Sequence, residues 1–260
     1  ETAGCPRRPN RGSASSLEWT FLELPSWIPP ADPFSDSSPS RSEWISLRET
    51  ADSTGTRYAV AMPSFAAILS PAKSLEMDAI DIPAGLALSK PRFAPQTREI
   101  ADELADFSAS RLGSLMSISD PLAELNHRRW AAFGTPRNPR GPAAMCFRGD
   151  VYQGLEAWTM KKASIDWAQD HVRILSGLYG LLRPLDVIQP YRLEMGTRLK
   201  IGERKNLYDF WQDRIVTTLE KDMAASGSTT LVNLASDEYS KAARLGDLSV
   251  PVITAKFLQI

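Results

Sequence analysis

The chain has 260 residues, with 30 Lys and Arg against 31 Asp and Glu, two His and two Cys. A formal net charge of −1 gives no electrostatic indication of a nucleic-acid or membrane partner, and no run reaches the roughly 18 apolar residues of a membrane span. Two cysteines exclude a disulfide framework and favour a reducing compartment. The two isolated His exclude a zinc site built from spaced Cys and His ligands. Composition therefore excludes several classes of protein and identifies none.

The first 61 residues differ in composition from the rest of the chain. They contain no Lys, six Arg and eight acids, a net charge of 6 − 8 = −2, whereas residues 62–260 hold 24 basic and 23 acidic groups. Segments such as 32–42, rich in Ser and Pro, bury too little apolar surface to offset the entropy lost on ordering. We therefore expect residues 1–61 to form a low-complexity, largely disordered N-terminal extension, and one folded domain to begin near Met62. The extension lacks the features of a secretory signal, and its acids argue against an organellar transit peptide.

Apolar runs and capping residues predict the first elements of the folded part. Residues 65–69 form a short apolar run that is typical of a buried strand. One helix is expected over 97–116, with its acids in the first turns. A second helix is expected over 120–133, opened by the Ser-Asp-Pro of 119–121. The three Pro and two Gly of 134–142 predict a loop.

The later elements alternate between helices and strands. Residues 206–224 carry apolar side chains on one face of an expected helix. The other expected elements are a strand over 143–147, a helix over 164–171, an element of undecided type over 172–175, and strands over 230–234 and 250–258. Because helices and strands interleave without a regular βαβ rhythm, the expected fold class is α+β, with a single mixed α/β domain over 62–260. The chain stops inside the last strand, so we expect the C-terminal part of the domain to be missing.

Special residues are concentrated between positions 175 and 196. Glycines permit a backbone to approach a ligand closely, and exposed amides beside Arg183 and Arg192 would suit phosphate. The alternative is a tight corner between strands, in which the glycines only satisfy geometry and Arg192 pairs with Asp186 or Glu194. The binding candidates in this segment are Ser176, Gly177, Tyr179, Gly180, Arg183, Tyr191 and Arg192.

A second concentration of residues is basic and aromatic. Seven basic groups lie within 35 residues, between Arg128 and Lys162, and aromatic side chains such as Trp130 and Trp158 interleave with them. Basic groups of this kind would neutralise phosphates, and the aromatic rings would stack on bases. The alternative is a solvated basic face together with ordinary core aromatics.

Three smaller features of the sequence bear on its chemistry. Ser70-Pro-Ala-Lys73 matches the S-x-x-K pattern in which Lys activates a nucleophilic Ser, but the companion K-T-G is absent. Lys73 would equally place a cation at the mouth of a cleft. Cys146 lies in an apolar run and is expected to be a buried thiol. His127 and His171 are expected to be surface or helix-packing residues.

A helix–hairpin–helix, which grips the DNA backbone through hairpin amides, can be placed at two positions. One is 115–123, a tight link between two expected helices that lacks hairpin glycines. The other is 172–182, whose Gly177 and Gly180 lie one residue too far apart for the usual Gly-x-Gly. The residues do not decide between these two segments.

Seven segments occur in an order that is found in a known family. They are 68–75 (ILSPAKSL), 118–123 (ISDPLA), 148–155 (RGDVYQGL), 175–186 (LSGLYGLLRPLD), 191–196 (YRLEMG), Phe210-Trp211 and 233–239 (NLASDEY). With these motifs, residues 62–260 resemble the YaaA family of peroxide-stress proteins. Met62 falls where chains of that family begin.

The resemblance implies a cytoplasmic protein that limits oxidative, iron-dependent damage under hydrogen peroxide. It also implies a mixed α/β fold peculiar to the family, with a basic cleft and a helix–hairpin–helix-like element that bind the DNA backbone without sequence preference. Contacts with DNA are expected from Lys73, Arg128, Arg129 and Arg148, together with the binding candidates of 175–196. The chain departs from the family in ending before a basic C-terminal segment and in carrying Arg148 where Lys is usual.

The alternative function is an enzyme of unknown substrate that uses the same cleft. Its motivation is a set of opposed charges in the family motifs, because such charges shift pKa values when they converge. The set consists of Lys73 and Arg192 with the possible cleft acids Asp150, Asp186, Glu194 and Glu238. Convergence in one pocket would favour an enzyme, and dispersal into separate ion pairs would oppose it. No catalytic residue, cofactor or metal ligand is assigned, so any iron effect is expected to be indirect.

Overall fold

The computed structural model describes residues 47–51, 57–61, 64–77, 80 and 82–256, and every structural statement below concerns these residues. The disorder expected over 1–61 therefore falls largely outside the described residues. Within that segment, β1 (Leu47–Ala51) and β2 (Arg57–Ala61) pair as an antiparallel two-stranded sheet, which the sequence analysis did not predict.

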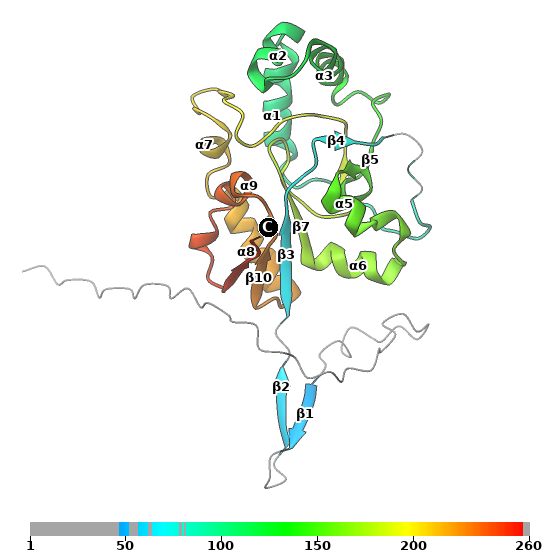
Figure 1. Cartoon of the computed structure of the whole chain (residues 1–260), viewed down its shortest axis with the longest axis vertical. Coiled ribbons are helices and arrows are strands. Elements are labelled where there is room, and N and C mark those ends of the chain that lie inside the picture. The colour runs from blue at the N-terminus through cyan, green and yellow to red at the C-terminus, as the bar shows by residue number, and fades with distance from the viewer. Residues whose placement is uncertain (1–46, 52–56, 62–63, 78–79, 81, 257–260) are drawn as a thin grey trace, which may run out of the picture. The chain divides into compact units, whose positions relative to one another are not determined.

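A five-stranded sheet forms the centre of the described domain. Its members are β3 (Phe65–Leu69), β7 (Val172–Ser176), β8 (Gly180–Leu182), β10 (Thr230–Asn233) and β11 (Val252–Thr254). They lie in the order β11-β10-β3-β7-β8 (Figure 1). The first four strands run parallel, and β8 runs antiparallel to β7 across a tight hairpin. The expected α+β class is thereby confirmed, and this sheet is mixed.

The strand order places a reversal of the winding direction at β3. From β3 the chain passes to β7 and β8 on one side, and it then crosses to β10 and β11 on the other side. The register pairs Ile68 of β3 with Asn233 of β10, so both strands end at the same edge of the sheet. In parallel α/β sheets, ligands bind outside the carboxyl ends of strands at such a reversal. The topology therefore directs attention to the ends of β3 and β10.

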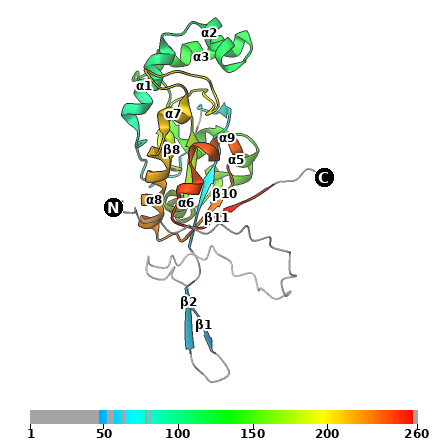
Figure 2. The ribbon, with the colours of Figure 1, turned by 90° about the vertical axis from the view of Figure 1, so that its left-hand side faces the viewer.

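Helices cover the sheet and one end of the domain. Those between β3 and β7 are α1 (Ala94–Ala105), α2 (Ala109–Met116), α3 (Asp120–Ala132), α4 (Ala143–Cys146), α5 (Asp150–Leu155) and α6 (Lys162–His171). Those after β8 are α7 (Leu207–Trp211), α8 (Arg214–Ser226) and α9 (Asp237–Ala242). Figures 1 and 2 both show α1, α2 and α3 gathered at one end, while α6 packs against β3 and β7.

Shorter elements connect the loops to this frame. Single 3-10 turns cover Ala157–Thr159 and Leu245–Asp247. β4 (Ser74–Leu75) pairs with β6 (Phe147–Arg148), and β5 (Gly141–Pro142) pairs with β9 (Val187–Ile188), both antiparallel. Among the described residues, no helix has the length and apolar character needed to cross a membrane.

Two of the expected helices are each divided into two. The helix expected over 97–116 is interrupted before α2, where the Ser108 side chain accepts a hydrogen bond from the Arg111 N–H at 3.3 Å and caps the new helix. The helix expected over 206–224 is interrupted at Gln212, whose φ is 45°. Apolar periodicity does not detect such a break, because the apolar stripe continues across it. The stripe residues 207, 210, 211, 215, 219 and 223 are all buried.

The prediction of a strand over 143–147 is wrong, because Ala143–Cys146 forms the short helix α4. These residues are buried on every side, so their apolar run has no period that separates a helix from a strand. Confirmed elements are the strand over 65–69, the helices over 120–133 and 164–171, and the strand over 230–234. The undecided segment 172–175 belongs to β7. Of the strand expected over 250–258, only 252–254 is strand, and 257–258 lie outside the described residues.

The β7–β8 hairpin is packed closely on both sides. Gly180 has φ 69°, and a Cβ there would lie 2.7 Å from the Trp211 ring. The Trp211 indole N–H donates to the Gly177 carbonyl at 2.9 Å. On the other side, a Cβ on Gly177 would lie 2.7 Å from the Leu193 carbonyl oxygen. Only glycine fits between these neighbours, and the close approach positions the segment that contains Leu193.

Candidate functional site

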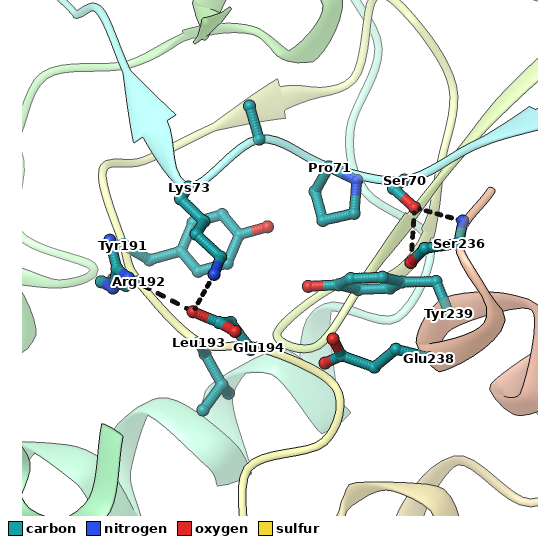
Figure 3. Close-up of a pocket in the computed structure, with 11 residues that line it drawn as sticks. Ser70, Pro71, Lys73, Tyr191, Arg192, Leu193, Glu194, Ser236, Glu238 and Tyr239 are labelled. Carbon is teal, nitrogen blue, oxygen red and sulfur yellow. Dashed lines mark hydrogen bonds and ion pairs between the residues drawn. The ribbon is translucent and has the colours of Figure 1, made fainter. Parts of the chain in front are cut away.

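A pocket of about 200 Å³ lies at the carboxyl ends of β3 and β10 (Figure 3). Three segments line it: residues 70–73 directly after β3, residues 191–194 after β9, and residues 236–239 at the start of α9 after β10. This is the position that the reversal of strand order predicts for a ligand site. We take this pocket as the candidate functional site.

One wall of the pocket is a chain of three charges. Oε1 of Glu194 lies 3.3 Å from Nζ of Lys73 and 3.3 Å from a terminal nitrogen of Arg192. The side chains are 66% exposed for Lys73, 32% for Glu194 and 19% for Arg192, so the three run from the mouth of the pocket inward. One carboxylate therefore holds two cations, and the wall has a net charge of +1.

The facing wall carries a second carboxylate. Oε1 of Glu238 accepts a hydrogen bond from the Gly196 N–H at 2.6 Å, and the Glu238 carbonyl accepts one from the Tyr208 hydroxyl at 3.1 Å. These contacts fix Glu238 at the start of α9 with its side chain in the pocket (Figure 3). A Cβ on Gly196 would lie 3.2 Å from that carboxylate, which explains a glycine at this position.

Two buried tyrosines bring hydroxyl groups to the centre of the pocket. Figure 3 shows the hydroxyls of Tyr191 and Tyr239 pointing toward one another from opposite sides. Tyr191 shares a hydrogen bond of 2.7 Å with the Ser176 hydroxyl. Burial raises the pKa of both tyrosines, and for Tyr239 the neighbouring Tyr191 and the charge of Glu238 raise it further. Both phenols are therefore neutral at physiological pH and serve as hydrogen-bond donors or acceptors.

Two serines close the remaining side of the pocket. The Ser70 hydroxyl accepts a hydrogen bond from the Ser236 N–H at 2.9 Å and donates one to the Ser236 hydroxyl at 3.2 Å. The Ser70 carbonyl accepts a further bond from the Tyr152 hydroxyl at 2.8 Å. Lys73 pairs with Glu194 instead of with Ser70. The structure therefore lends no support to an S-x-x-K nucleophile, and the second interpretation of Lys73, a cation at the mouth of a cleft, agrees with its position.

Helix α3 brings a further cation near the pocket. Burial lowers the pKa of Arg129, and the positive charge of Arg192 lowers it further. The two guanidinium groups are thus close enough to repel one another. Lys73, Arg129 and Arg192, which come from three separate segments, form what we call the cation cluster. Arg128, the preceding residue on α3, is exposed to solvent.

The glycine-rich candidates have a structural role. Ser176, Gly177, Tyr179 and Gly180 form the β7–β8 hairpin and are all buried. The Ser176 hydroxyl accepts a hydrogen bond from the Tyr179 N–H at 3.0 Å, and the Tyr179 hydroxyl accepts one from the Gln189 N–H at 2.9 Å. The expectation of exposed amides for phosphate is wrong at these residues. The alternative, a tight corner between strands with Arg192 paired to Glu194, is confirmed.

Other predicted site residues lie outside the pocket. Asp186 is fully buried and accepts hydrogen bonds from Arg183 and from the Ser89 hydroxyl. Arg148 donates to the Met145 and Phe147 carbonyls and stacks over the Trp158 ring, at 4.5 Å from its centre. Asp150 is exposed in the first turn of α5. Of the six charges proposed for an enzyme, the four that line the pocket are Lys73, Arg192, Glu194 and Glu238.

The two helix–hairpin–helix positions have different outcomes. Residues 172–182 form the β7–β8 hairpin, so this placement is wrong. Residues 115–123 span the end of α2, a three-residue link and the start of α3, and the two helices pack against one another. A helix pair with a short link is therefore present there, and its contact with DNA stays a prediction.

The expected roles of the isolated Cys and His agree with their surroundings. Cys146 is buried, and desolvation raises the pKa of its thiol to about 12, so it is not a reactive nucleophile. The His127 ring bonds to the Phe107 carbonyl at 3.0 Å, and the His171 ring stacks on Trp167. In the described part of the chain, no group of three or more His, Cys, Asp or Glu is arranged to hold a metal ion.

Sequence reasoning missed Ser236 and Tyr239 as members of the site. Both lie in the segment 233–239 that carries part of the family resemblance, so a signal was present. The missing information was that β10 lies beside β3 in the sheet, which brings the segments after these two strands together.

Comparisons with known proteins connect this chain to one family. A family model described as peroxide stress protein YaaA matches residues 65–260. A UPF0246 protein of Cereibacter sphaeroides is 52% identical over 194 residues, which cover 74% of this chain and 76% of the relative. A UPF0246 protein of Burkholderia lata is 47% identical over 195 residues, covering 73% of this chain and 74% of the relative. A UPF0246 protein of Hahella chejuensis is 45% identical over 195 residues, which cover 74% of this chain and 75% of the relative.

Proposed function

The chain belongs to the YaaA family of peroxide stress proteins, and we propose on this basis that it binds the DNA backbone and limits iron-dependent oxidative damage. The proposed contact surface is the cation cluster of Lys73, Arg129 and Arg192 together with the exposed face of α3. The proposed location is the cytoplasm, where the DNA of a bacterial-type cell lies. The partner is the backbone, without sequence preference.

The observation that carries the proposal is that Lys73 and Arg192 meet at Glu194, with Arg129 of α3 near enough to Arg192 for its charge to act on it. Lys73 follows β3, Arg129 lies on α3, and Arg192 follows β9. Arg129 and Arg192 are close enough for the charge of one to lower the pKa of the other. Glu194 offsets the repulsion between Lys73 and Arg192. The repulsion between Arg129 and Arg192 costs free energy, which a bound anion would reduce. A DNA backbone supplies closely spaced phosphates to such a cluster.

Helix α3 extends the cationic surface beyond the pocket. Arg128 is exposed, and it forms no ion pair within the described residues. The link between α2 and α3 contains Ser117 in a left-handed conformation with φ 50°. The chain therefore turns sharply there and leads into α3, on which Arg128 and Arg129 are adjacent. This arrangement supports a backbone contact by the helix pair.

Protection against iron-dependent damage is proposed as an indirect effect. Restricting access to DNA would reduce oxidation of the bases without any need to bind iron. Tight, stoichiometric iron binding by the purified full chain, lost when one carboxylate cluster is replaced, would overturn this part of the proposal. The metal content of purified protein and its titration with ferrous iron provide the measurement.

An enzyme remains the second candidate, and a specific observation favours it. Lys73, Arg192, Glu194 and Glu238 converge in one pocket, as acid–base chemistry requires. Against it, Asp186 is used in an internal ion pair, and Asp150 is not among the residues that line the pocket. The two candidate functions predict different effects of one substitution, Glu194→Gln. It would raise DNA affinity if the protein binds DNA, and it would lower the activity of an acid–base enzyme.

The test of the proposal is DNA binding by the full chain at low salt. Fluorescence anisotropy with labelled duplex and four-way junction DNA gives the dissociation constants. We expect binding to both, with weaker binding for Arg128→Ala. Lys221→Ala, which removes an exposed cation from α8, serves as the matched control and should bind as the parent does. Absence of binding to either DNA at low salt would contradict the proposal.

A further inference from the structure

The pocket beside the cation cluster is too small for double-stranded DNA. Its volume of about 200 Å³ is that of a cube about 6 Å wide, whereas the major groove of a duplex alone is about 12 Å wide. A duplex whose backbone contacts Lys73, at the mouth of the pocket, would therefore lie over the pocket without entering it. A single base can enter a pocket of this kind once it has left the base stack. The interior of the pocket thus suits a base, whereas Lys73 at its mouth and Arg129 on α3 suit the backbone.

The charges of the pocket lining are balanced. Lys73 and Arg192 contribute +2, and Glu194 and Glu238 contribute −2, so the sum is zero. Glu194 lies 3.3 Å from each of the two cations, and Glu238 supplies the second negative charge. A phosphate placed inside would face two carboxylates, which oppose an anion. A neutral ligand that carries both hydrogen-bond donors and acceptors has no such conflict.

The polar groups of the pocket match the edges of a nucleobase. The carboxylates of Glu194 and Glu238 accept hydrogen bonds, as ring and exocyclic N–H groups require. The hydroxyls of Tyr191 and Tyr239 point toward the centre and can donate to ring nitrogens or carbonyl oxygens (Figure 3). Both residues are almost completely buried, at 4% and 7% exposed, so packing fixes the positions of their hydroxyls.

Arg192 is held more loosely than its burial suggests. Its ion pair with Glu194 is 3.3 Å long, and its Nε is buried with no hydrogen-bond partner among the described residues. Most buried donors in proteins are satisfied, so an unsatisfied one beside a pocket requires an explanation. The guanidinium can turn toward a ligand carbonyl while giving up only one long contact. This is a second feature that favours a polar ligand.

We infer that the pocket binds a single nucleobase, either extruded from DNA held by the cation cluster or supplied as a free nucleoside. The first source rests on the proposed function, since it needs DNA to be bound outside the pocket. The lining supplies acceptors from Glu194 and Glu238 and donors from the two tyrosines. Lys73 and Arg129 would hold the phosphates that flank the extruded base, and Arg192 would face the base.

The test uses the full chain and a duplex that contains 2-aminopurine in an unpaired position. End-label anisotropy reports binding of the DNA, and 2-aminopurine emission, which rises when the base leaves the stack, reports extrusion. We expect the emission to rise on binding. We also expect the unpaired-base duplex to bind roughly tenfold more tightly than the fully paired duplex, because unpairing costs less at such a site.

Two pocket variants and one control sharpen this test. Ser236→Trp places a large side chain at the pocket, and Glu238→Gln removes an acceptor without changing the volume. Each should abolish most of the emission change and most of the preference for the unpaired base. Ser249→Trp, the same substitution at an exposed serine outside the pocket, should keep both. Circular dichroism melting establishes that each variant is folded.

The outcomes separate this inference from the proposed function. Tight DNA binding without an emission change, and without any thermal stabilisation by free nucleosides, would overturn the inference and leave DNA binding intact. Absence of DNA binding would remove the extruded base as the source. In that case a rise in melting temperature with nucleosides, lost in Ser236→Trp and kept in Ser249→Trp, would support the free ligand, and no rise would overturn the inference.

Discussion

Two neighbouring stretches of the chain carry similar residues but differ in their hydrogen bonds and ion pairs. The first is the β7–β8 hairpin with its following turn (172–186), and the second is the segment 191–196. Arg183 donates to Asp186 from its backbone N–H at 2.8 Å and from its guanidinium at 3.0 Å. Arg192 makes one contact of 3.3 Å and leaves its Nε unpaired among the described residues. Saturated polar groups identify the first stretch as framework, and incompletely bonded groups identify the second as site.

The folded domain, framework and site alike, is predicted to lose stability at alkaline pH. Burial raises the pKa of Cys146 from 9.0 to about 12. The folded protein therefore keeps a proton that the unfolded chain loses, and between these values the free energy of unfolding falls with rising pH by about 1.4 kcal/mol per unit. The same direction holds for the buried tyrosines Tyr152, Tyr179, Tyr191 and Tyr239.

Urea unfolding at a series of pH values measures this effect. The contribution of these groups to the free energy of unfolding should be fully present below pH 9 and should decrease toward pH 12. Cys146→Ala should make this decrease less steep. A free energy of unfolding that is independent of pH across this range would contradict the burial of Cys146 and of these tyrosines.

The next largest effect is expected for Asp186→Ala. Asp186 is completely buried, and its loss leaves Arg183, 29% exposed, without its partner. Because Arg183 is partly solvated, we expect a loss of about 3 kcal/mol, at the lower end for a broken buried pair. Denaturant unfolding measures it. Asp102→Ala, which breaks an exposed pair with Arg98 on α1, should cost less than about 0.5 kcal/mol. Equal losses in the two variants would contradict the assignment of Asp186 to the framework.

A smaller effect is expected where the two stretches touch. Gly177→Ala would place a Cβ 2.7 Å from the Leu193 carbonyl oxygen and would push on the pocket segment. We expect a loss of about 1–3 kcal/mol, as for other overpacked positions. Gly154→Ala in α5 is the matched control, since no atom lies within 4 Å of its added Cβ. It should be neutral or stabilising by up to about 1 kcal/mol. Chemical denaturation of the pair tests the contact, and equal stabilities would show that the segments do not meet.

The smallest change in stability is expected for Glu194→Gln in the site. The carboxylate is 32% exposed and its two ion pairs are long, so its loss should change the free energy of unfolding by less than about 1 kcal/mol. DNA affinity at low salt should rise, because Lys73 and Arg192 lose their counter-ion. Anisotropy titrations check this sign. A fall in affinity would contradict the role of these cations in binding DNA.

Periodicity and capping residues predicted most elements, and they failed where a local hydrogen bond or a buried run decided the structure. The Ser108 cap divided one expected helix, and a left-handed Gln212 divided another, although the apolar stripe was correct in the second case. The uniformly buried 143–147 has no period, so its short helix α4 could not be distinguished from a strand.

The candidate site could be predicted in part. Lys73, Arg192, Glu194 and Glu238 were named from the sequence, and all four line the pocket. The glycine-rich candidates were misassigned, because a glycine required by packing against Trp211 has the same sequence signature as one required by a ligand. Which strands lie side by side is not encoded locally, so the meeting of the segments after β3 and β10 became clear only from the fold.

The most direct test of the central claim is the salt dependence of DNA binding by the full chain and by a double variant, Lys73→Ala with Arg129→Ala. The logarithm of the association constant should fall linearly with the logarithm of salt concentration. The slope should be shallower in the double variant by about 1.8, or about 0.9 for each lost phosphate contact. An unchanged slope and affinity in the double variant would contradict the claim that the cation cluster binds the DNA backbone.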